Sequence, residues 1–169
     1  MSHADADCRP RAARREPVSK QRLRLWLRLL TASRFIEHNV RDKLRTDFAT
    51  TLPRFDVLAA LFRNSKGLKM SELSQALKVS NGNVTGIVDR LVEDGLIVRV
   101  AVPGDRRAYL VRLTRRGVAE FEAMAGANEI WVNEMLSGLT AAECATLISL
   151  LSRVDRQDVA NVEASTGAG

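Results

Sequence analysis

Apolar residues recur at intervals of three and four along most of the chain, which is the period of helices that bury one face. On the first such stretch, Leu29, Ile36, Val40 and Leu44 fall on one side. We expect six helices, over residues 18–48, 53–63, 70–77, 81–94, 115–137 and 141–160. Beyond about residue 160 the chain is expected to fray.

Capping residues mark several of these helix ends. Ser80 or Asn81 is placed to cap the fourth helix, and Gly95 is placed to end it in a left-handed conformation. Thr114 precedes the fifth helix as a cap. Thr140-x-x-Glu143 is the pattern of a capping box at the start of the sixth helix.

Between the fourth and fifth helices the pattern changes to two β-rich runs, residues 96–102 and 107–113, around Pro103-Gly104-Asp105-Arg106. Such runs on either side of a turn predict a two-stranded hairpin. The short turn Lys78-Val79-Ser80 joins the third and fourth helices. The pattern therefore predicts a mainly α fold with a small β wing, a winged helix-turn-helix.

The helices outside this unit carry more apolar surface than one small core requires. On the first helix, Trp26 and Leu30 begin a second apolar stripe. The last two helices add Trp131, Met135, Leu147, Leu151 and Val154. Apolar surface of this extent is expected to be partly buried against a partner chain.

Composition excludes several classes of protein. Of 169 residues, 46% are hydrophobic and 27% charged, and no run approaches the ~18 apolar residues of a membrane helix. The first twenty residues lack the apolar segment of a secretory signal, so a cytoplasmic protein is expected. Two cysteines and two histidines predict neither a disulfide framework nor a metal site or cofactor. No nucleophile stands in a motif with a base and an orienting acid, so we expect no enzyme.

Positive charge is concentrated in the middle of the chain. Residues 63–116 hold eleven Lys and Arg against five Asp and Glu, whereas residues 117–169 hold two against eight. A basic segment of this kind suits a polyphosphate partner, because each cation that meets a phosphate releases condensed counterions. The acidic last third is expected to point away from that partner.

The fourth helix has the outward face that would suit a DNA major groove. With Val84, Val88 and Leu91 turned inward, that face and its flanks comprise Ser80, Asn81, Gly82, Asn83, Thr85, Gly86, Asp89 and Arg90. Each helical glycine costs about 1 kcal/mol relative to Ala. Close approach of the backbone to DNA would explain both glycines, and simple tolerance is the alternative.

The hairpin tip has the chemistry for the neighbouring minor groove or a phosphate. Arg106 and Arg107 stand there without apolar neighbours to bury them. Asp105 either pairs with Arg107 or Arg90 and stiffens the wing, or simply forms the turn. Ser71, in the first turn of the third helix, is a further candidate for a phosphate contact.

Three stretches together resemble the MarR (multiple antibiotic resistance regulator) family of bacterial repressors. They are LPRFDVLAAL, MSELSQALKVSNGNVTGIVDRLVEDGLI and VPGDRRAYLVRLTRRG. The last contains the wing signature Asp-x-Arg…Leu-Thr-x-x-Gly. The chain departs from the family pattern at Lys69, just before the third helix, where many relatives have a Ser or Thr that caps this helix. The resemblance implies a homodimer on a pseudo-palindromic double-stranded operator, released by a small aromatic or anionic effector.

Five segments follow from this resemblance and the patterning together. They are a mobile basic arm (1–17), a dimerisation helix (18–50), the winged helix-turn-helix (51–114), two further dimerisation helices (115–160) and a frayed tail (161–169).

An effector site is expected on the first helix. A stripe there changes from apolar to cationic through Trp26, Leu30, Arg34, His38 and Arg41. Asp56 either favours the dipole of its own helix or, as the resemblance implies, lines a ligand cleft. The run Ser80 to Gly86 is similar to a subgroup that controls aromatic-acid catabolism, some members of which respond to hydroxycinnamoyl-CoA. This likeness implies an aromatic acyl-CoA, with the free acid as the alternative.

Two other functions fit parts of the pattern. A winged helix can serve as an adaptor for acidic protein partners. The second alternative is a redox-sensing regulator of the same family through Cys8, whose thiolate Arg9 and Arg11 would favour. Cys144 is expected to be a packing residue.

Overall fold

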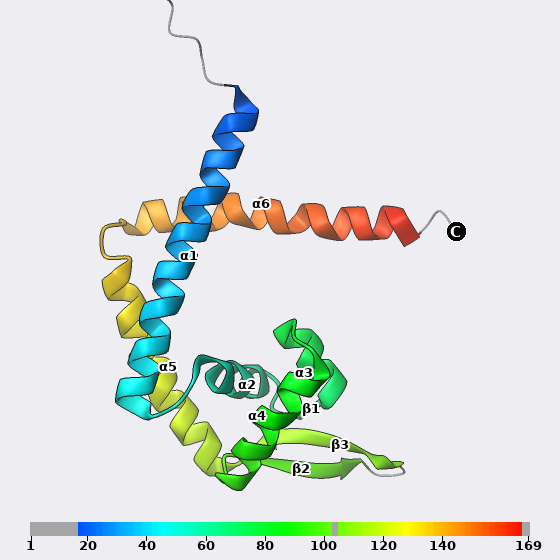
Figure 1. Ribbon diagram of the computed structural model, residues 1–169. Coiled ribbons are helices and arrows are strands. Elements are labelled where there is room, and N and C mark those ends of the chain that lie inside the picture. The colour runs from blue at the N-terminus through cyan, green and yellow to red at the C-terminus, as the bar shows by residue number, and fades with distance from the viewer. Residues whose placement is uncertain (1–16, 103–104, 167–169) are drawn as a thin grey trace, which may run out of the picture. The chain divides into compact units, whose positions relative to one another are not determined.

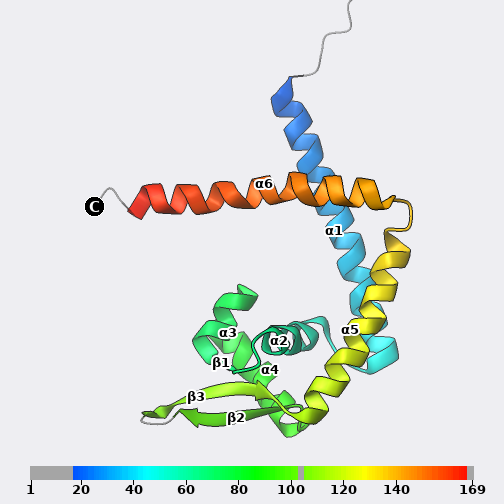
Figure 2. The same ribbon diagram turned by 180° about the vertical axis from the view of Figure 1, so that it is seen from behind.

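The computed structural model describes residues 17–102 and 105–166, except for the side chains of Asn81 and of residues 102, 105–108 and 155–166 (Figures 1 and 2). The predicted arm, apart from Pro17, and Cys8 lie outside the described residues. The described chain falls into two compact units that divide after His38, inside the first helix.

Six helices and three strands make up the described chain, which confirms a mainly α fold with a small β wing. The helices are α1 (Val18–Phe48), α2 (Leu52–Arg63), α3 (Met70–Leu77), α4 (Asn81–Glu93), α5 (Arg115–Met135) and α6 (Ala141–Thr166). The strands are β1 (Leu68–Lys69), β2 (Ile97–Val102) and β3 (Asp105–Leu113). Helix α6 extends to Thr166, past the end expected near residue 160.

The core of the second unit lies where α2, α3 and α4 pack on one another and on the sheet. Its fully buried side chains are Leu44, Val57, Leu58, Leu61, Leu73, Val84, Val88, Leu91, Ile97 and Val111. Burying an aliphatic side chain of this size stabilises the fold by about 1.5–3 kcal/mol. Because Val84, Val88 and Leu91 are 0% exposed, the inward face predicted for α4 is confirmed, and its opposite face is directed to solvent.

The sheet has a strand that the sequence pattern did not predict. Strands β2 and β3 form the expected hairpin, with Ile97 opposite Leu113, but β1 adds to the other edge of β3, with Leu68 opposite Val111. A two-residue strand is too short to show the alternation that identifies strands in a sequence. Strand β3 also begins at Asp105, two residues earlier than expected, and pairs past an irregularity at Ala101/Val102.

The predicted caps of α5 and α6 are present. Thr114 Oγ1 accepts a hydrogen bond from Gly117 N at 3.0 Å. At α6, Thr140 N donates to Glu143 Oε2 at 2.8 Å and Glu143 N donates to Thr140 Oγ1 at 3.3 Å. The Thr140 backbone N–H, followed by its hydroxyl, lowers the pKa of Glu143. The cap therefore stabilises α6 above the usual pKa of a carboxyl, and this effect is lost as pH falls through the lowered pKa.

Helix α3 begins at Met70 although Lys69, at its N-cap, has no side-chain acceptor. Glu72 supplies the missing group, because its Oε2 accepts from Lys69 N at 2.7 Å. The expected helix therefore forms with its cap provided from inside the first turn.

Trp131 is buried within its own chain, so it is not among the apolar residues that a partner chain would have to cover. It is 6% exposed, its ring lies 6.1 Å from that of Phe48, and Lys43 Nζ lies 5.5 Å from its centroid. These partners come from α1, which only the folded chain brings to α5. Leu147, Leu151 and Val154 of α6 are exposed, as expected.

Candidate nucleic-acid interface

The helix-turn-helix brings most of the candidate contact residues to one surface. Lys78 turns the chain between α3 and α4 with a positive φ of 54°, and Val79 N donates to Ser74 O at 3.2 Å. On α4, five candidate residues are exposed: Gly82, Asn83, Thr85, Gly86 and Arg90. Ser71 in the first turn of α3 is exposed as well.

Ser80 occupies the N-cap position of α4, and Asn81 is the first helical residue. The Ser80 carbonyl accepts from Asn83 N at 3.2 Å, but the hydroxyl makes no capping bond. Ser80 is exposed. A phosphate contact by Ser80 therefore remains a prediction.

Neither glycine of α4 is required by the packing of the described chain. A Cβ added at Gly82 or Gly86 would meet nothing within 4 Å, and neither residue has a positive φ. By contrast, Gly67 and Gly95 adopt φ values of 92° and 71°. The left-handed conformation expected at Gly95 is confirmed. Gly82 and Gly86 weaken α4 with no compensating gain within the described chain.

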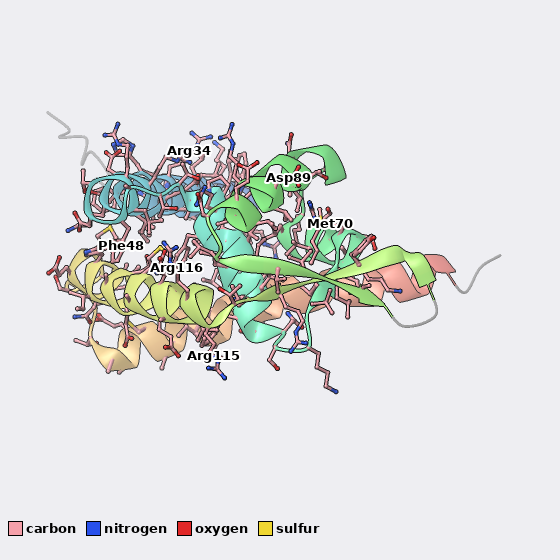
Figure 3. All side chains as sticks on the ribbon, turned by 90° about the horizontal axis from the view of Figure 1, so that it is seen from below. Arg34, Phe48, Met70, Asp89, Arg115 and Arg116 are labelled. Carbon is pink, nitrogen blue, oxygen red and sulfur yellow. The ribbon has the colours of Figure 1, made fainter. Side chains whose placement is uncertain are left out.

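Asp89 of α4, labelled in Figure 3, forms an ion pair with Arg99 of β2 that the sequence did not predict. Both side chains are part-exposed, so the pair contributes at most about 1 kcal/mol. Its effect is geometric, because it ties the exposed face of α4 to the strand that begins the wing.

A second network holds the C-terminal end of α4. Arg54 Nη2 of α2 pairs with Asp94 Oδ2, Arg116 Nη1 donates to Asp94 O at 3.2 Å, and Thr114 Oγ1 donates to Gly95 O at 2.8 Å. The Arg54–Asp94 pair joins residues forty positions apart in the sequence. No local pattern could have identified it.

The wing residues are placed by their backbone. Asp105, Arg106 and Arg107 are the first residues of β3, and their side chains lie outside the described part of the chain. The pairing expected for Asp105 and the DNA contacts expected for both arginines therefore remain predictions.

The candidate effector residues are divided between the two units. Trp26, Leu30, Arg34 and His38 belong to the first unit, and Figure 3 labels Arg34. The Trp26 side chain is 55% exposed. Arg41 and Asp56 belong to the second. Asp56 lines a hollow of about 400 Å³ beside α4, together with Pro53, Leu77, Val79, Asn83 and Ile87.

The described residues include no group of three or more His, Cys, Asp or Glu side chains that could hold a metal ion. Within the same residues, no helix is both long and apolar enough to cross a membrane.

Comparison with known proteins gives matches to transcription regulators that share this winged-helix fold. The pattern that describes the MarR family matches residues 50–108. The multiple antibiotic resistance protein MarR of Escherichia coli is 33% identical over 121 residues, which cover 68% of this chain and 82% of that protein. The regulator PecS of Dickeya dadantii is 30% identical over 122 residues, 71% of this chain and 74% of PecS.

Two further matches add detail. A transcriptional regulatory protein for the hcr operon of Thauera aromatica is 38% identical over 95 residues, and the chain spans 57% of its length. A solved structure of mutant E. coli MarR complexed with operator DNA has a TM-score of 0.69 at 28% identity, covering 82% of this chain and 99% of that one. The chain is thus a winged-helix transcription regulator. It belongs to the MarR family.

Proposed function

We propose that this protein is a cytoplasmic homodimeric repressor that binds a pseudo-palindromic operator in double-stranded DNA. The observation that carries the proposal is the exposed polar face of α4, on which two glycines leave the helix backbone open to solvent. The opposite, apolar face of α4 is fully buried. Backbone that lies this open suits close approach to a DNA groove. The MarR structure complexed with operator DNA supports the same use of the fold.

Charge supports the proposal. The segment that contains the helix-turn-helix and wing, residues 63–116, holds eleven Lys and Arg against five Asp and Glu, an excess that equals the net charge of the whole chain, +6. Asp89, an acidic residue on the exposed side of α4, forms an ion pair with Arg99. The ion pair therefore reduces the repulsion between that carboxylate and the phosphates of DNA.

The dimer is supported by apolar side chains that the described chain leaves exposed on α6. Leu147, Ile148, Leu150, Leu151 and Val154 are each at least 40% exposed. Exposed apolar surface of this extent marks an interaction site. A two-fold dimer would place two copies of α4 over half-sites about 10 bp apart.

The wing provides the first test of DNA binding. Arg107→Ala should weaken operator binding by about 1–3 kcal/mol and reduce the slope of log K against log salt by about one unit, because one phosphate or minor-groove contact is lost. Replacing Asn83 or Thr85 should instead change the preferred sequence. Fluorescence anisotropy over a salt series, after selection of bound genomic fragments, measures both effects.

Arg45→Ala is the matched control, because Arg45 is an exposed arginine of α1 that pairs with Asp42 on the same helix. It should leave the salt slope unchanged. An unchanged slope for Arg107→Ala as well would remove the wing from the interface. Weak binding that is indifferent to sequence would favour an adaptor for acidic proteins over a repressor.

Gly86→Ala should have effects of opposite sign on folding and on DNA binding. The methyl group enters open space, so the free energy of unfolding should rise by about 0.5–1 kcal/mol. Operator affinity should fall by about 1–3 kcal/mol, because the methyl group overpacks the contact with DNA. Gly126→Ala in α5, which also meets nothing within 4 Å, should stabilise the protein without changing affinity. Equal affinities for both variants would show that Gly86 is merely tolerated.

We further propose that the repressor controls genes of aromatic-compound catabolism and is released by an aromatic acyl-CoA or aromatic acid. The likeness to the hcr operon regulator and the α1 stripe support this. Trp26 and Leu30 would pack the ring, Arg34, His38 and Arg41 would meet phosphates, and Asp56 would line the cleft. Release requires the ligand to favour a spacing of the two α4 helices that misfits DNA.

Joint replacement of Arg34 and Arg41 by Ala should keep operator affinity and abolish release by hydroxycinnamoyl-CoA. Anisotropy of operator DNA, with and without saturating ligand, measures this. If the ligand leaves the operator affinity of the unmodified protein unchanged, the acyl-CoA assignment is wrong, although DNA binding would still stand.

A further inference from the structure

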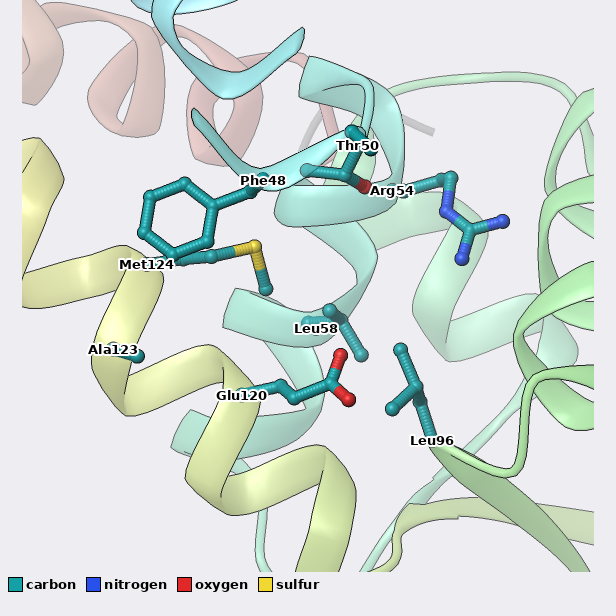
Figure 4. A pocket seen from close by; sticks show the side chains of 9 residues that line it. Phe48, Thr50, Arg54, Leu58, Leu96, Glu120, Ala123 and Met124 are labelled. Carbon is teal, nitrogen blue, oxygen red and sulfur yellow. The ribbon is translucent and has the colours of Figure 1, made fainter. Parts of the chain in front are cut away.

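Helix α4 is held firmly at its C-terminal end. Leu91 in its last turn is 0% exposed, and Asp94, which follows the helix, pairs with Arg54 of α2. Figure 4 shows Arg54 on the wall of one pocket together with Leu96, which is 5% exposed. Because these contacts join the end of α4 to α2 and to the core, this end opens only when the core around it opens.

The N-terminal end of α4 makes fewer contacts. Val84 is 0% exposed, but Gly82 and Asn83 before it are exposed. Asn83 and Ile87 line the hollow of about 400 Å³ beside the helix, so the first two turns lie partly over unfilled space. A segment opens most easily where it buries few apolar contacts. The first two turns are therefore the part of α4 that the core holds least.

Hydrogen bonding at this end of α4 is weaker than at the start of α5. The first helical bond of α4, from Val84 N to Ser80 O, measures 3.3 Å, against 2.9 Å from Val118 N to Thr114 O in α5. Thr114 caps α5 through its hydroxyl, whereas the Ser80 hydroxyl makes no capping bond. The first turn of α4 also has no acidic residue to favour the helix dipole. Its first amides are therefore left to water.

The residue types of these two turns disfavour a helix. Residues 81–86 read Asn-Gly-Asn-Val-Thr-Gly. Glycine has the lowest helix propensity of any residue except proline, and Asn and Thr rank low on the same scale. Lys78, in the turn before α4, has a φ of 54°, which is unfavourable for a residue with a Cβ. Opening the start of α4 therefore gains chain entropy at two glycines and frees Lys78 to leave this conformation.

We propose that the first two turns of α4, residues 81–87, open locally in the free protein and close into the helix on the operator. Asn83 and Thr85, the exposed candidates for base contact, lie on this segment. Base contacts supply the ordering energy, which contacts to phosphates outside the segment do not. A sequence that offers only some of the base contacts leaves the segment open and loses them all. The ordering step rests on the proposed function, whereas the open start of α4 does not.

Hydrogen exchange on the free full-length protein tests the open start. The amides of residues 84–87 should have protection factors roughly 30-fold or more below those of residues 118–121, because local opening exposes only the first set. Residues 118–121 are the matching turn of α5, which Thr114 caps. Equal protection of the two segments would overturn the proposal.

Ser80→Asp tests the cause of the opening. Asp is a favoured N-cap residue and its carboxylate suits the helix dipole, so protection of residues 84–87 in the free protein should rise about 5-fold. Ser65→Asp makes the same change of charge in an exposed turn outside α3 and α4, and should leave that protection unchanged. No rise in Ser80→Asp, or an equal rise in both variants, would overturn this account of the open start.

Exchange on DNA tests the ordering step. An operator, obtained by selection of bound genomic fragments, is compared with a shuffled duplex of the same length, each at saturating concentration in low salt. The operator should raise protection of residues 84–87 about tenfold or more, and the shuffled duplex less than about twofold, because only the operator closes the segment. Residues 118–121 should be unchanged on both. Equal protection of residues 84–87 on the two duplexes would overturn the ordering step.

The two experiments separate this inference from the proposed function. A protein whose α4 start is already protected in the free state, but which binds an operator, would refute the inference alone. A protein whose α4 start exchanges quickly, but which selects no DNA sequence, would refute the proposed function and the ordering step that rests on it. The open start of α4 would then stand.

Discussion

Replacing Gly117 with Ala should cost about 3–5 kcal/mol of the free energy of unfolding, which is among the largest effects of a single substitution. An added Cβ would lie 1.9 Å from Leu96 O and 2.9 Å from Leu96 C, so the backbone of α5 or of Leu96, which precedes β2, would have to move. The clash is with main chain rather than with a flexible side chain. No change of rotamer can relieve it.

The movement would also break the hydrogen bonds that start α5. Thr114 N donates to Leu96 O at 3.0 Å, and Gly117 N donates to Thr114 Oγ1 at 3.0 Å. Chemical denaturation followed by circular dichroism measures the loss. Gly126→Ala on the same helix is the control, and should instead stabilise the protein by about 0.5–1 kcal/mol. Similar stabilities for the two variants would mean that α5 does not approach Leu96 as described.

Placing two lysines on the apolar face of α6 should convert the proposed dimer to a monomer. Ile148 and Leu151 are 67% and 40% exposed, so Ile148→Lys with Leu151→Lys should leave the core of each chain intact. In a dimer interface the two charges would lose their hydration without a partner. Sedimentation equilibrium at micromolar concentration should then give the mass of one chain.

Loss of the dimer should lower operator affinity by about 10²- to 10⁴-fold, because two linked half-site contacts become separate binding events. Ser149→Lys, at an exposed polar position of the same helix, should leave both mass and affinity nearly unchanged. A double-lysine variant that stays dimeric and binds its operator normally would place the dimer interface elsewhere.

Local patterning was sufficient for the helices and the wing hairpin of this fold. The spacing of apolar residues identified all six helices, and Thr114, Gly95 and the Thr140–Glu143 pair were identified correctly at helix ends. These features depend on residues within one or two turns of each other, so their physical causes are contained in a short stretch of chain. The exposed face of α4 followed from the same period.

Contacts between distant segments were decided by the tertiary structure. The partners of Trp131, the Asp89–Arg99 and Arg54–Asp94 pairs and the edge strand β1 join residues that no local period relates. For example, whether an exposed charge finds a partner depends on distances set by the packing of whole elements. The sequence alone thus determined which helices form, where they begin and which face α4 exposes, and only the folded chain decided which side chains hold the C-terminal end of α4.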